Sequence, residues 1–364
     1  MTWISETVKV VVFTGAGAGK ADGAPLQTEL FQEFFSRAAI PVSRRQLADD
    51  VAGFFKAVFG IDPRQQPGVA LPTFEEALGV LELAITREEG ILGVSAQHSE
   101  RGLQHLRRQL ILALAATIAR TTTSPTSHHS RLVASLREGA LLDQITFVTT
   151  NYDTLLDDAI ELEAVRSARG TGSLLDYGFG DLVQRESGRY AERRTFRCYK
   201  IHGSLNWLYC AACDALHITE SDGVTRLVDE PHAARCPTCE TLRTSVIIPP
   251  SYYKDMSSMY LAIVWNNAFR ALRTADQIVF CGYSFPDADM HIKYLVKRAQ
   301  LNRDRETQPL RVLLVNNHPG KTPGTVDAEN RRFSRFLGRA DVEDTGLSFE
   351  QFASDPASVL GRRL

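Results

Sequence analysis

The sequence has no run of apolar residues long enough to cross a bilayer. A membrane-spanning helix needs about 18 such residues, and no stretch of this 364-residue chain approaches that length. The first seven residues, MTWISET, lack the basic and apolar segments of a secretory signal peptide. We therefore expect a cytoplasmic protein that makes no use of a membrane.

A strong excess of charge of either sign is also missing. The chain has 41 basic and 43 acidic residues, so its formal net charge is −2. This balance gives no electrostatic reason to expect an anionic partner. We expect no direct binding of nucleic acid. The hydrophobic content of 44% is enough for a sizeable core.

Cysteines are few, six in all, and four of them form two CxxC pairs. The four are Cys210, Cys213, Cys236 and Cys239. Two such pairs can complete a tetrahedral Zn²⁺ site, and four thiolates leave no open position for a substrate. We therefore predict a structural zinc ion, with free thiols or two disulfides as the alternatives. Cys198 and Cys281 lie on predicted strands and are interpreted as small buried hydrophobic residues.

Two common nucleotide-binding motifs are absent, although the first predicted strand ends in a glycine-rich turn. The apolar run Val8–Thr14 leads directly into GAGAG at residues 15–19, a junction typical of nucleotide-binding α/β folds. The P-loop pattern fails because Ala21 has no hydroxyl for Mg²⁺. The GxGxxG pattern fails because Lys20 replaces its third glycine. The turn can either cradle a pyrophosphate with its N–H groups or serve only as a tight turn.

Predicted strands alternate with helical segments along the rest of the chain. Further buried strands are expected at 144–150, 195–201, 277–282 and 310–315. This alternation predicts an α/β fold with a Rossmann-like, doubly wound parallel sheet. Residues 166–193 are interpreted as loop, and the chain after Asn317 as short helices.

We predict one domain with four parts. The Rossmann-like core comprises 1–29, 141–205 and 246–325. A helical insertion occupies 30–140, in which Thr73–Glu76 forms a capping box. The paired cysteines lie in a small zinc-ribbon module at 206–245, in which all four cysteines would bind the metal. A helical tail spans 326–364.

Four short segments, taken together, resemble the sirtuin superfamily. In chain order they are Gly15-Ala-Gly17 with Gly23-Ala-Pro25, Thr150-Asn-Tyr-Asp153, Lys200-Ile-His-Gly203 and Gly282-Tyr-Ser284. The paired cysteines fall between the third and fourth segments, as they do in sirtuins. The longer motifs TTNYDTLL, KIHGSLNWLYC and GYSFPDAD resemble the bacterial sirtuin-like branch more closely. Several members of that branch hydrolyse NAD in anti-phage defence.

The resemblance implies a role for each matched residue. Asn151 would lie at the nicotinamide ribose, Asp153 at the nicotinamide amide and His202 at the ribose hydroxyls, as catalytic residues. The implied NAD-binding residues are Gly15, Ala16, Gly17, Pro25, Gly282, Ser284 and Asn316. Two structural alternatives stay open: Asp153 can be the N-cap of the next helix, and a lone His202 can be a packed histidine.

The sequence departs from protein-deacylating sirtuins after Pro25. Those sirtuins continue with Asp-Phe-Arg, whereas Leu26-Gln27-Thr28 follows here. The lost side chains would position the cofactor and shield the reactive ribose, so water becomes the favoured acceptor. We predict an NAD⁺ glycohydrolase that acts as a regulated effector in bacterial anti-phage defence. The alternatives are an NAD-dependent protein-lysine deacylase and an inactive NAD- or nucleotide-binding module. The sequence does not separate hydrolysis from cyclisation.

Family analogy also suggests partners for this chain. No sensor segment is recognisable after Asn317, so a trigger would have to act through another chain or through assembly. We expect a homo-oligomer, together with a partner ATPase or sensor chain.

Overall fold

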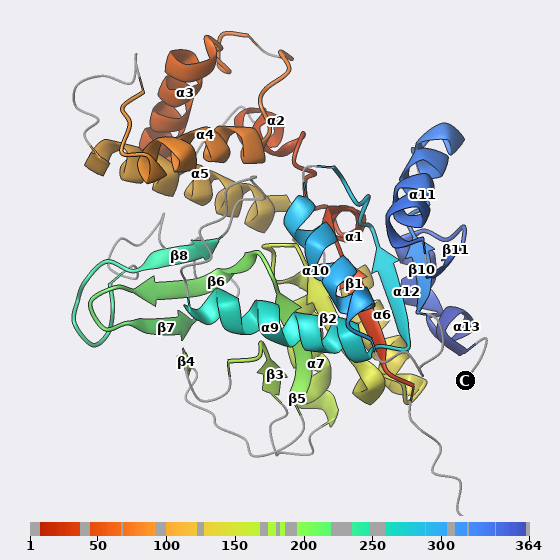
Figure 1. The fold of residues 1–364 in the computed structure, drawn as a ribbon. Coiled ribbons are helices and arrows are strands. Elements are labelled where there is room, and N and C mark those ends of the chain that lie inside the picture. Colours follow the sequence, from red (N-terminus) through yellow and green to blue (C-terminus); the bar gives the residue numbers. More distant parts are fainter. Residues whose placement is uncertain are drawn as a thin grey trace, which may run out of the picture.

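The structure is a computed structural model. It describes residues 8–36, 44–66, 68–91, 100–121, 127–167, 174–179, 183–185, 195–219, 235–247, 259–287, 289–303, 310–318, 320–338 and 340–361. Within these residues, a seven-stranded sheet runs in the order β11-β10-β9-β1-β2-β5-β3, and every pairing is parallel (Figure 1). The strands are β1 (Val10–Thr14), β2 (Ile145–Thr149), β3 (Leu174–Asp176), β5 (Thr195–Lys200), β9 (Gln277–Cys281), β10 (Arg311–Val315) and β11 (Asp341–Asp344).

The central strands are short and apolar throughout. VVVFT in β1, ITFVT in β2 and QIVFC in β9 are buried at every position. Such runs are expected where helices cover both faces of a sheet. The predicted Rossmann-like parallel sheet is therefore confirmed. β1 lies between β2 and β9, so the carboxyl ends of three strands meet at one edge.

Helices lie on both faces of this sheet. α9 and α10 pack together in front in Figure 1, and α6 lies behind with α7 and α12. The helices around the sheet are α1 (Ala16–Ala21), α6 (His128–Glu138), α7 (Leu155–Ser167), α9 (Met259–Thr274), α10 (Met290–Leu301), α11 (Pro323–Leu337), α12 (Phe349–Ser354) and α13 (Ala357–Leu360), with the short turn η2 (Leu142–Gln144).

A separate helical region stands above one end of the sheet in Figure 1. It consists of α2 (Leu30–Phe35), α3 (Arg45–Phe59), α4 (Phe74–Thr86) and α5 (Glu100–Thr121), which share their own hydrophobic cluster. The predicted capping box at the start of α4 is confirmed. Glu76 N donates to Thr73 Oγ1 at 3.1 Å, and Thr73 N donates to Glu76 Oε2 at 2.7 Å.

A second sheet follows the order β4-β7-β6-β8. Its strands are β4 (Val183–Arg185), β6 (Gly203–Cys210), β7 (Ala215–Ile218) and β8 (Thr244–Ile247). β6 continues from β5 after the two-residue turn at Ile201 and His202, and it pairs antiparallel with β7 and β8. The chain therefore passes from the large sheet into the small one at the turn that contains His202.

The structure adds details to the expected four-part division, which itself stays a prediction. α6 contributes Leu132, Val133 and Leu136 to the cluster of the large sheet and not to that of α2–α5. The C-terminal tail contains a strand, β11, which extends the large sheet through pairing with β10. The short strands β3 and β4 lie inside the segment interpreted as loop.

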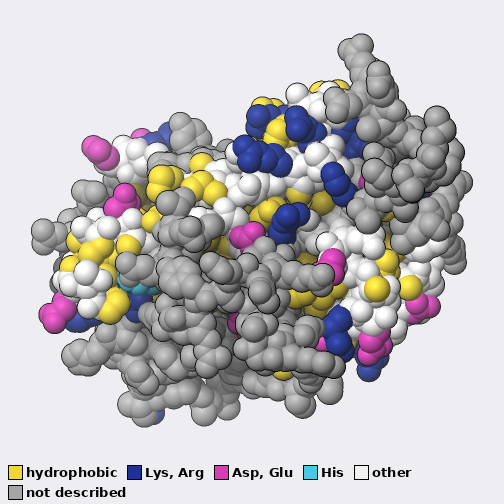
Figure 2. Space-filling view, turned by 90° about the horizontal axis from the view of Figure 1, so that it is seen from below, with side chains coloured by type: hydrophobic (Ala, Val, Ile, Leu, Met, Phe, Trp, Pro, Cys, Tyr) yellow, Lys and Arg dark blue, Asp and Glu magenta, His cyan; other side chains and the backbone are white. Residues whose placement is uncertain are grey.

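Charges on the described surface are mixed. On the face in Figure 2, Lys and Arg side chains lie in several groups among acidic and apolar ones. This agrees with the formal net charge of −2. Among the described helices, none is both long enough and apolar enough to cross a membrane.

Candidate functional site

A pocket of about 520 Å³ lies at the carboxyl edge of the large sheet. Open α/β sheets commonly bind ligands at this edge, where neighbouring connections leave in opposite directions. The predicted site residues that line the pocket are Ala16, Gly17, Pro25, Asn151, Asp153, His202, Gly282 and Ser284. All four sequence segments therefore meet at one cavity. The roles assigned to these residues stay predictions.

Gly15 and Asn316 are not among the residues that line this pocket. Asn316 is buried, and both ends of its amide bond the backbone of Tyr283. Its Oδ1 accepts from Tyr283 N at 3.0 Å, and its Nδ2 donates to Tyr283 O at 2.7 Å. Asn316 thus holds the Gly282–Ser284 segment in place.

The glycine turn begins a short helix and packs tightly against the end of β9. Gly15 N donates to Cys281 O at 3.0 Å, and Gly17 N donates to Gly282 O at 2.8 Å. A Cβ on Gly17 would lie 2.8 Å from Gly282 O and 2.3 Å from His318 Nε2. These glycines are required because two strand ends approach closely. The N–H groups of Gly15 and Gly17 already donate to backbone carbonyls, so other groups would have to bind a pyrophosphate.

Asn151 and Asp153 lie against the glycine turn. Asn151 Nδ2 donates to Gly15 O at 3.0 Å. Asp153 Oδ1 accepts from Leu155 N at 3.1 Å, so this carboxylate bonds the first N–H of α7 from the position before the N-cap. A Cβ on Gly19 would lie 3.2 Å from Asp153 Oδ2. Asp153 therefore supports the helix start and lines the pocket at the same time.

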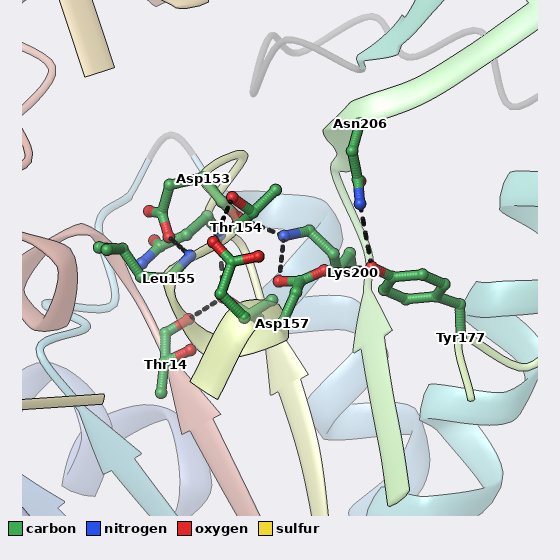
Figure 3. A network of polar contacts seen from close by, with 11 residues as sticks. Thr14, Asp153, Thr154, Leu155, Asp157, Tyr177, Lys200 and Asn206 are labelled. Carbon is green, nitrogen blue, oxygen red and sulfur yellow. Dashed lines mark hydrogen bonds and ion pairs between the residues drawn. The ribbon is translucent and has the colours of Figure 1, made fainter. Parts of the chain in front are cut away.

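A buried polar network fixes the backbone at Asp153 (Figure 3). Lys200, 1% exposed, places Nζ 2.8 Å from Asp157 Oδ2 and donates to the backbone oxygen of Asp153. The Tyr177 hydroxyl donates to Asp157, and Asn206 Nδ2 donates to that hydroxyl at 3.2 Å. Burial alone would lower the pKa of Lys200, but the charges of Asp157 and Asp153 outweigh it and raise the pKa. The network joins β5, β6 and α7 around the Asp153 turn.

His202 is buried, at 3% exposure, and faces a second histidine. Its Nε2 lies 2.8 Å from Nε2 of His291, near the start of α10. The rings of Tyr152 and His202 are 6.1 Å apart. Trp265 Nε1 donates to Ile201 O at 2.8 Å, which fixes the backbone just before His202. Sequence reasoning missed His291, because only the fold brings α10 to the end of β5.

Two ion pairs that the sequence did not predict also line the pocket. Lys20 Nζ lies 2.6 Å from Glu29 Oε2, and Leu26 N donates to the same oxygen at 2.9 Å. Glu29 therefore fixes the backbone at Leu26, the first residue of the segment that differs from protein-deacylating sirtuins. In the second pair, Lys321 Nζ lies 2.7 Å from Glu329 Oε2. The pocket thus carries charges of both signs.

Residues 145–334, more than half of the chain, match a family model described as a SIR2-like domain. The chain belongs to the SIR2-like family. The solved structure "Sir2-p53 peptide-NAD+" is 15% identical with a TM-score of 0.39, over 98% of this chain and 95% of that chain. The solved structure "Structure of Sir2Tm bound to a propionylated peptide" is 16% identical with a TM-score of 0.40, over 98% and 94%. No curated protein matches the chain.

The paired cysteines of this SIR2-like chain form one compact cluster. The sulfur atoms of Cys210, Cys213, Cys236 and Cys239 lie within 4.8 Å of one another. Cys210 and Cys239 are 3.4 Å apart, and Cys213 and Cys236 are 3.9 Å apart. Tetrahedral Zn–S bonds of about 2.3 Å would place the sulfurs about 3.8 Å apart. The donor set therefore fits Zn²⁺.

The pKa values of these thiols shift in both directions. Hydrogen bonding to Cys239 raises the pKa of Cys213 to about 12, whereas the pKa values of Cys239 and Cys236 are lowered. The side chain and backbone of Thr241 lower the pKa of Cys239 to about 6 by hydrogen bonding. Burial raises the pKa of Cys236, but backbone N–H groups of Thr238 and Cys239 outweigh it and lower the pKa to about 7. Thiolates are the form that binds metal. None of the four cysteines lines the pocket, which agrees with a structural site.

The other two cysteines behave as small buried residues, as predicted. Cys198 and Cys281 are fully buried in the cluster of the large sheet. Burial raises the pKa of each thiol well above its usual range. Neither lines the pocket, so neither is placed to act as a nucleophile there.

The helical region forms part of the pocket wall. Leu30 of α2, Glu75 of α4, and Leu114 and Ile118 of α5 all line it. Sequence reasoning did not place any of these four residues at the site. The predicted helical insertion therefore helps to enclose the cavity.

Proposed function

We propose that this SIR2-like protein is an NAD⁺ glycohydrolase, which releases nicotinamide and ADP-ribose. The observation that carries the proposal is the meeting of its four SIR2-type segments around one pocket of about 520 Å³. That volume lies in the range of about 300–1,000 Å³ that is usual for cofactor sites. Membership of the SIR2-like family supports NAD⁺ as the ligand.

The residues at the pocket suit cleavage of the nicotinamide–ribose bond. The nicotinamide ring is cationic in NAD⁺ and leaves as a neutral molecule, so no general acid is needed. The barrier lies in the oxocarbenium-like ribose, as in other glycosidic cleavages. A well-placed water and a base or hydrogen-bond partner lower that barrier. Asn151, Asp153 and His202 line the pocket and would supply these groups.

Two features of the wall support water as the acceptor. Leu26 and Gln27 line the pocket in place of the Asp-Phe-Arg triplet of protein-deacylating sirtuins. Leu114 and Ile118 of the helical region line the same cavity. We expect these apolar side chains to restrict the entry of an acyl-lysine peptide. Protein-lysine deacylation is therefore the second candidate, favoured by the paired cysteines and the His-Gly pair.

The deciding experiment follows free nicotinamide after NAD⁺ is added, with and without an acyl-lysine peptide. We expect release without peptide, and a loss of about 100-fold or more in Asn151→Ala and in His202→Ala. Asn302→Ala and His105→Ala are matched controls, because both side chains are exposed and neither lines the pocket.

Each other outcome contradicts the proposal in a distinct way. Release that requires the peptide identifies a deacylase. A rate that survives both Asn151→Ala and His202→Ala removes the assigned residues. A rise in Tm with NAD⁺ or ADP-ribose, without turnover under activating conditions, identifies an inactive binding module. Analysis of the product separates linear from cyclic ADP-ribose.

The cellular role and assembly are further parts of the proposal. We infer a structural Zn²⁺ ion at the four cysteines, supported by their spacing. A regulated role in bacterial anti-phage defence, a homo-oligomer and a partner ATPase or sensor chain are supported by the sequence resemblance alone. Measurement of the mass in solution tests assembly, and a fully active monomer would contradict it.

A further inference from the structure

We propose that His291 is a positioning residue that fixes the hydrogen at Nε2 of His202, so that the two imidazoles accept one proton as a unit. This inference rests on the proposed NAD⁺ hydrolysis. It adds a residue that lies outside all four SIR2-type segments.

The first argument is the distance between the two rings. His202 Nε2 and His291 Nε2 are 2.8 Å apart, which is hydrogen-bond distance. Two imidazole nitrogens can bond only if one carries a hydrogen and the other presents its lone pair. The protonation of His202 Nε2 is therefore tied to that of His291. Two cationic rings would place N–H against N–H, so the pair accepts its second proton much less readily than its first.

The second argument is that both rings are held in place by the same framework. Trp265 bonds the carbonyl of Ile201, and its ring lies 5.5 Å from that of His291. α10 begins directly after Asp289, whose Oδ2 accepts from the Tyr283 hydroxyl at 2.8 Å. The Gly282–Ser284 segment therefore sets the position of the helix that carries His291.

Three titratable residues, Tyr152, Glu75 and Asp289, line the same pocket as His202. Tyr152 packs beside His202, and burial together with Glu75 and Asp289 raises the pKa of Tyr152 well above its usual value. Tyr152 is therefore neutral. Glu75 from α4 and Asp289, the N-cap residue of α10, both line the pocket, so carboxyl groups from two elements share it with His202.

The step that the pair serves is the attack of water. The bond between C1′ and the nicotinamide nitrogen breaks, and its electrons neutralise the cationic ring. The water oxygen bonds C1′, and a water proton passes to His202 and is later lost to solvent. A neutral His291 that accepts from the charged ring stabilises it, because hydrogen bonds from charged donors are stronger.

The test compares two variants at one position. Gln can donate and accept in place of His291, whereas Phe keeps the ring volume and removes both nitrogens. We expect His291→Phe to lower kcat about tenfold to a hundredfold, as for other residues that orient a functional histidine. The KM should be unchanged, and the acid limb of the pH profile should move to lower pH. His291→Gln should recover most of the lost kcat. Tyr294→Phe, on the same helix and 63% exposed, is the control.

A second readout separates this inference from the proposed function. Long-range ¹H–¹⁵N spectra of labelled protein report which imidazole nitrogens carry hydrogen, with or without turnover. His291→Phe should shift the His202 nitrogen signals, and Tyr294→Phe should not. If the parent never releases nicotinamide, the proposed function fails while the spectra still test the pair.

Three results would overturn the pairing. They are a kcat of His291→Phe within about twofold of the parent, equal losses in the Gln and Phe variants, and His202 signals that do not respond to His291→Phe. Should the Phe variant fail to fold, His291→Asn replaces it, because its amide is too short to reach His202 Nε2.

Discussion

Within the described part of the chain, the buried apolar side chains form two cores, and the site lies where they meet. The sheet core contains fully buried strands joined by backbone hydrogen bonds in fixed register. The helical core is built from α2–α5 and contains aromatic pairs such as Phe31 and Phe55, with centroids 4.7 Å apart. Four residues from outside the helical region join its core: Tyr152, Leu205, Leu208 and Ile247.

Those shared residues lie beside the candidate catalytic ones. Tyr152 stands between Asn151 and Asp153, and Leu205 follows His202 by three positions. The backbone of the site belongs to the sheet core, while neighbouring side chains are buried by the helical core. The sheet therefore positions the site, and the helical region encloses it. Changes in the two cores should therefore have separable effects.

The largest effect should come from Lys200→Met in the sheet core. The change leaves Asp157, whose side chain is 3% exposed, as a buried charge without its cation. Breaking a buried ion pair in this way costs about 3–5 kcal/mol. The measurement is the free energy of unfolding in urea. The double variant Lys200→Met/Asp157→Leu is the control, and it should recover a substantial part of the loss. A loss below about 1 kcal/mol would show that the network contributes little.

Leu78→Ala should have a somewhat smaller effect, confined to the helical core. Leu78 of α4 is fully buried, and such a truncation costs about 2–5 kcal/mol. Because the helical region forms part of the pocket wall, the KM for NAD⁺ should also rise. Amide exchange should increase in α2–α5 before it increases in β1, β2 and β9. Leu83→Ala, 40% exposed on the same helix, is the control. Equal exchange in both cores would mean that they unfold as one unit.

The sequence predicted the sheet core better than the pocket wall. Apolar runs such as Val8–Thr14 identify buried strands by themselves, and the capping box at Thr73 marks a helix start. Short strands such as β3 and β11 carry no such run. Each lies at an edge of the large sheet and is stabilised by pairing with a single strand, β5 or β10. They form only when the sheet edge is already present.

The candidate site likewise contains residues that the sequence predicts and residues that only the fold reveals. The segments around Asn151 and His202 were identified by their sequence motifs, and the fold brings them to one pocket. His291 and the pair Lys20–Glu29 were missed, because their importance depends on distances across the fold. A histidine near the start of a helix carries no local signal of its partner. Such residues become visible only when α10 and β5 are placed together.

The contact between Asp22 and His129, beside the large sheet, should make the free energy of unfolding depend on pH. Asp22 Oδ2 lies 2.5 Å from His129 Nδ1, and both side chains are buried. Burial raises the pKa of Asp22, but His129 and the N–H groups of His128 and His129 outweigh it and hold the pKa below 3.8. A lowered pKa contributes stability above pH 3.8, and this stability is lost as the pH falls through the folded-state pKa.

Asp22→Asn should therefore lose about 1–3 kcal/mol at neutral pH. The difference in the free energy of unfolding between Asp22→Asn and the parent should shrink as the pH falls below about 3.8. Urea unfolding across a pH series measures it, and Asp62→Asn in the helical region is the control. A difference that stays constant down to about pH 3 would show that the charge of Asp22 does not contribute.

The smallest effect compares two helix caps, one in the helical region and one beside the large sheet. Thr73 caps α4 and Ser348 caps α12, each through a side-chain oxygen that accepts a backbone N–H. Either change to Ala should cost about 1 kcal/mol. Only Thr73→Ala should also raise the KM for NAD⁺, because it loosens the turn that carries Glu75 into the pocket, whereas no residue of α12 lines the pocket. Calorimetry and NAD⁺ kinetics on both variants measure this. An equal rise in KM would mean that the helical region encloses the pocket no more closely than α12 does.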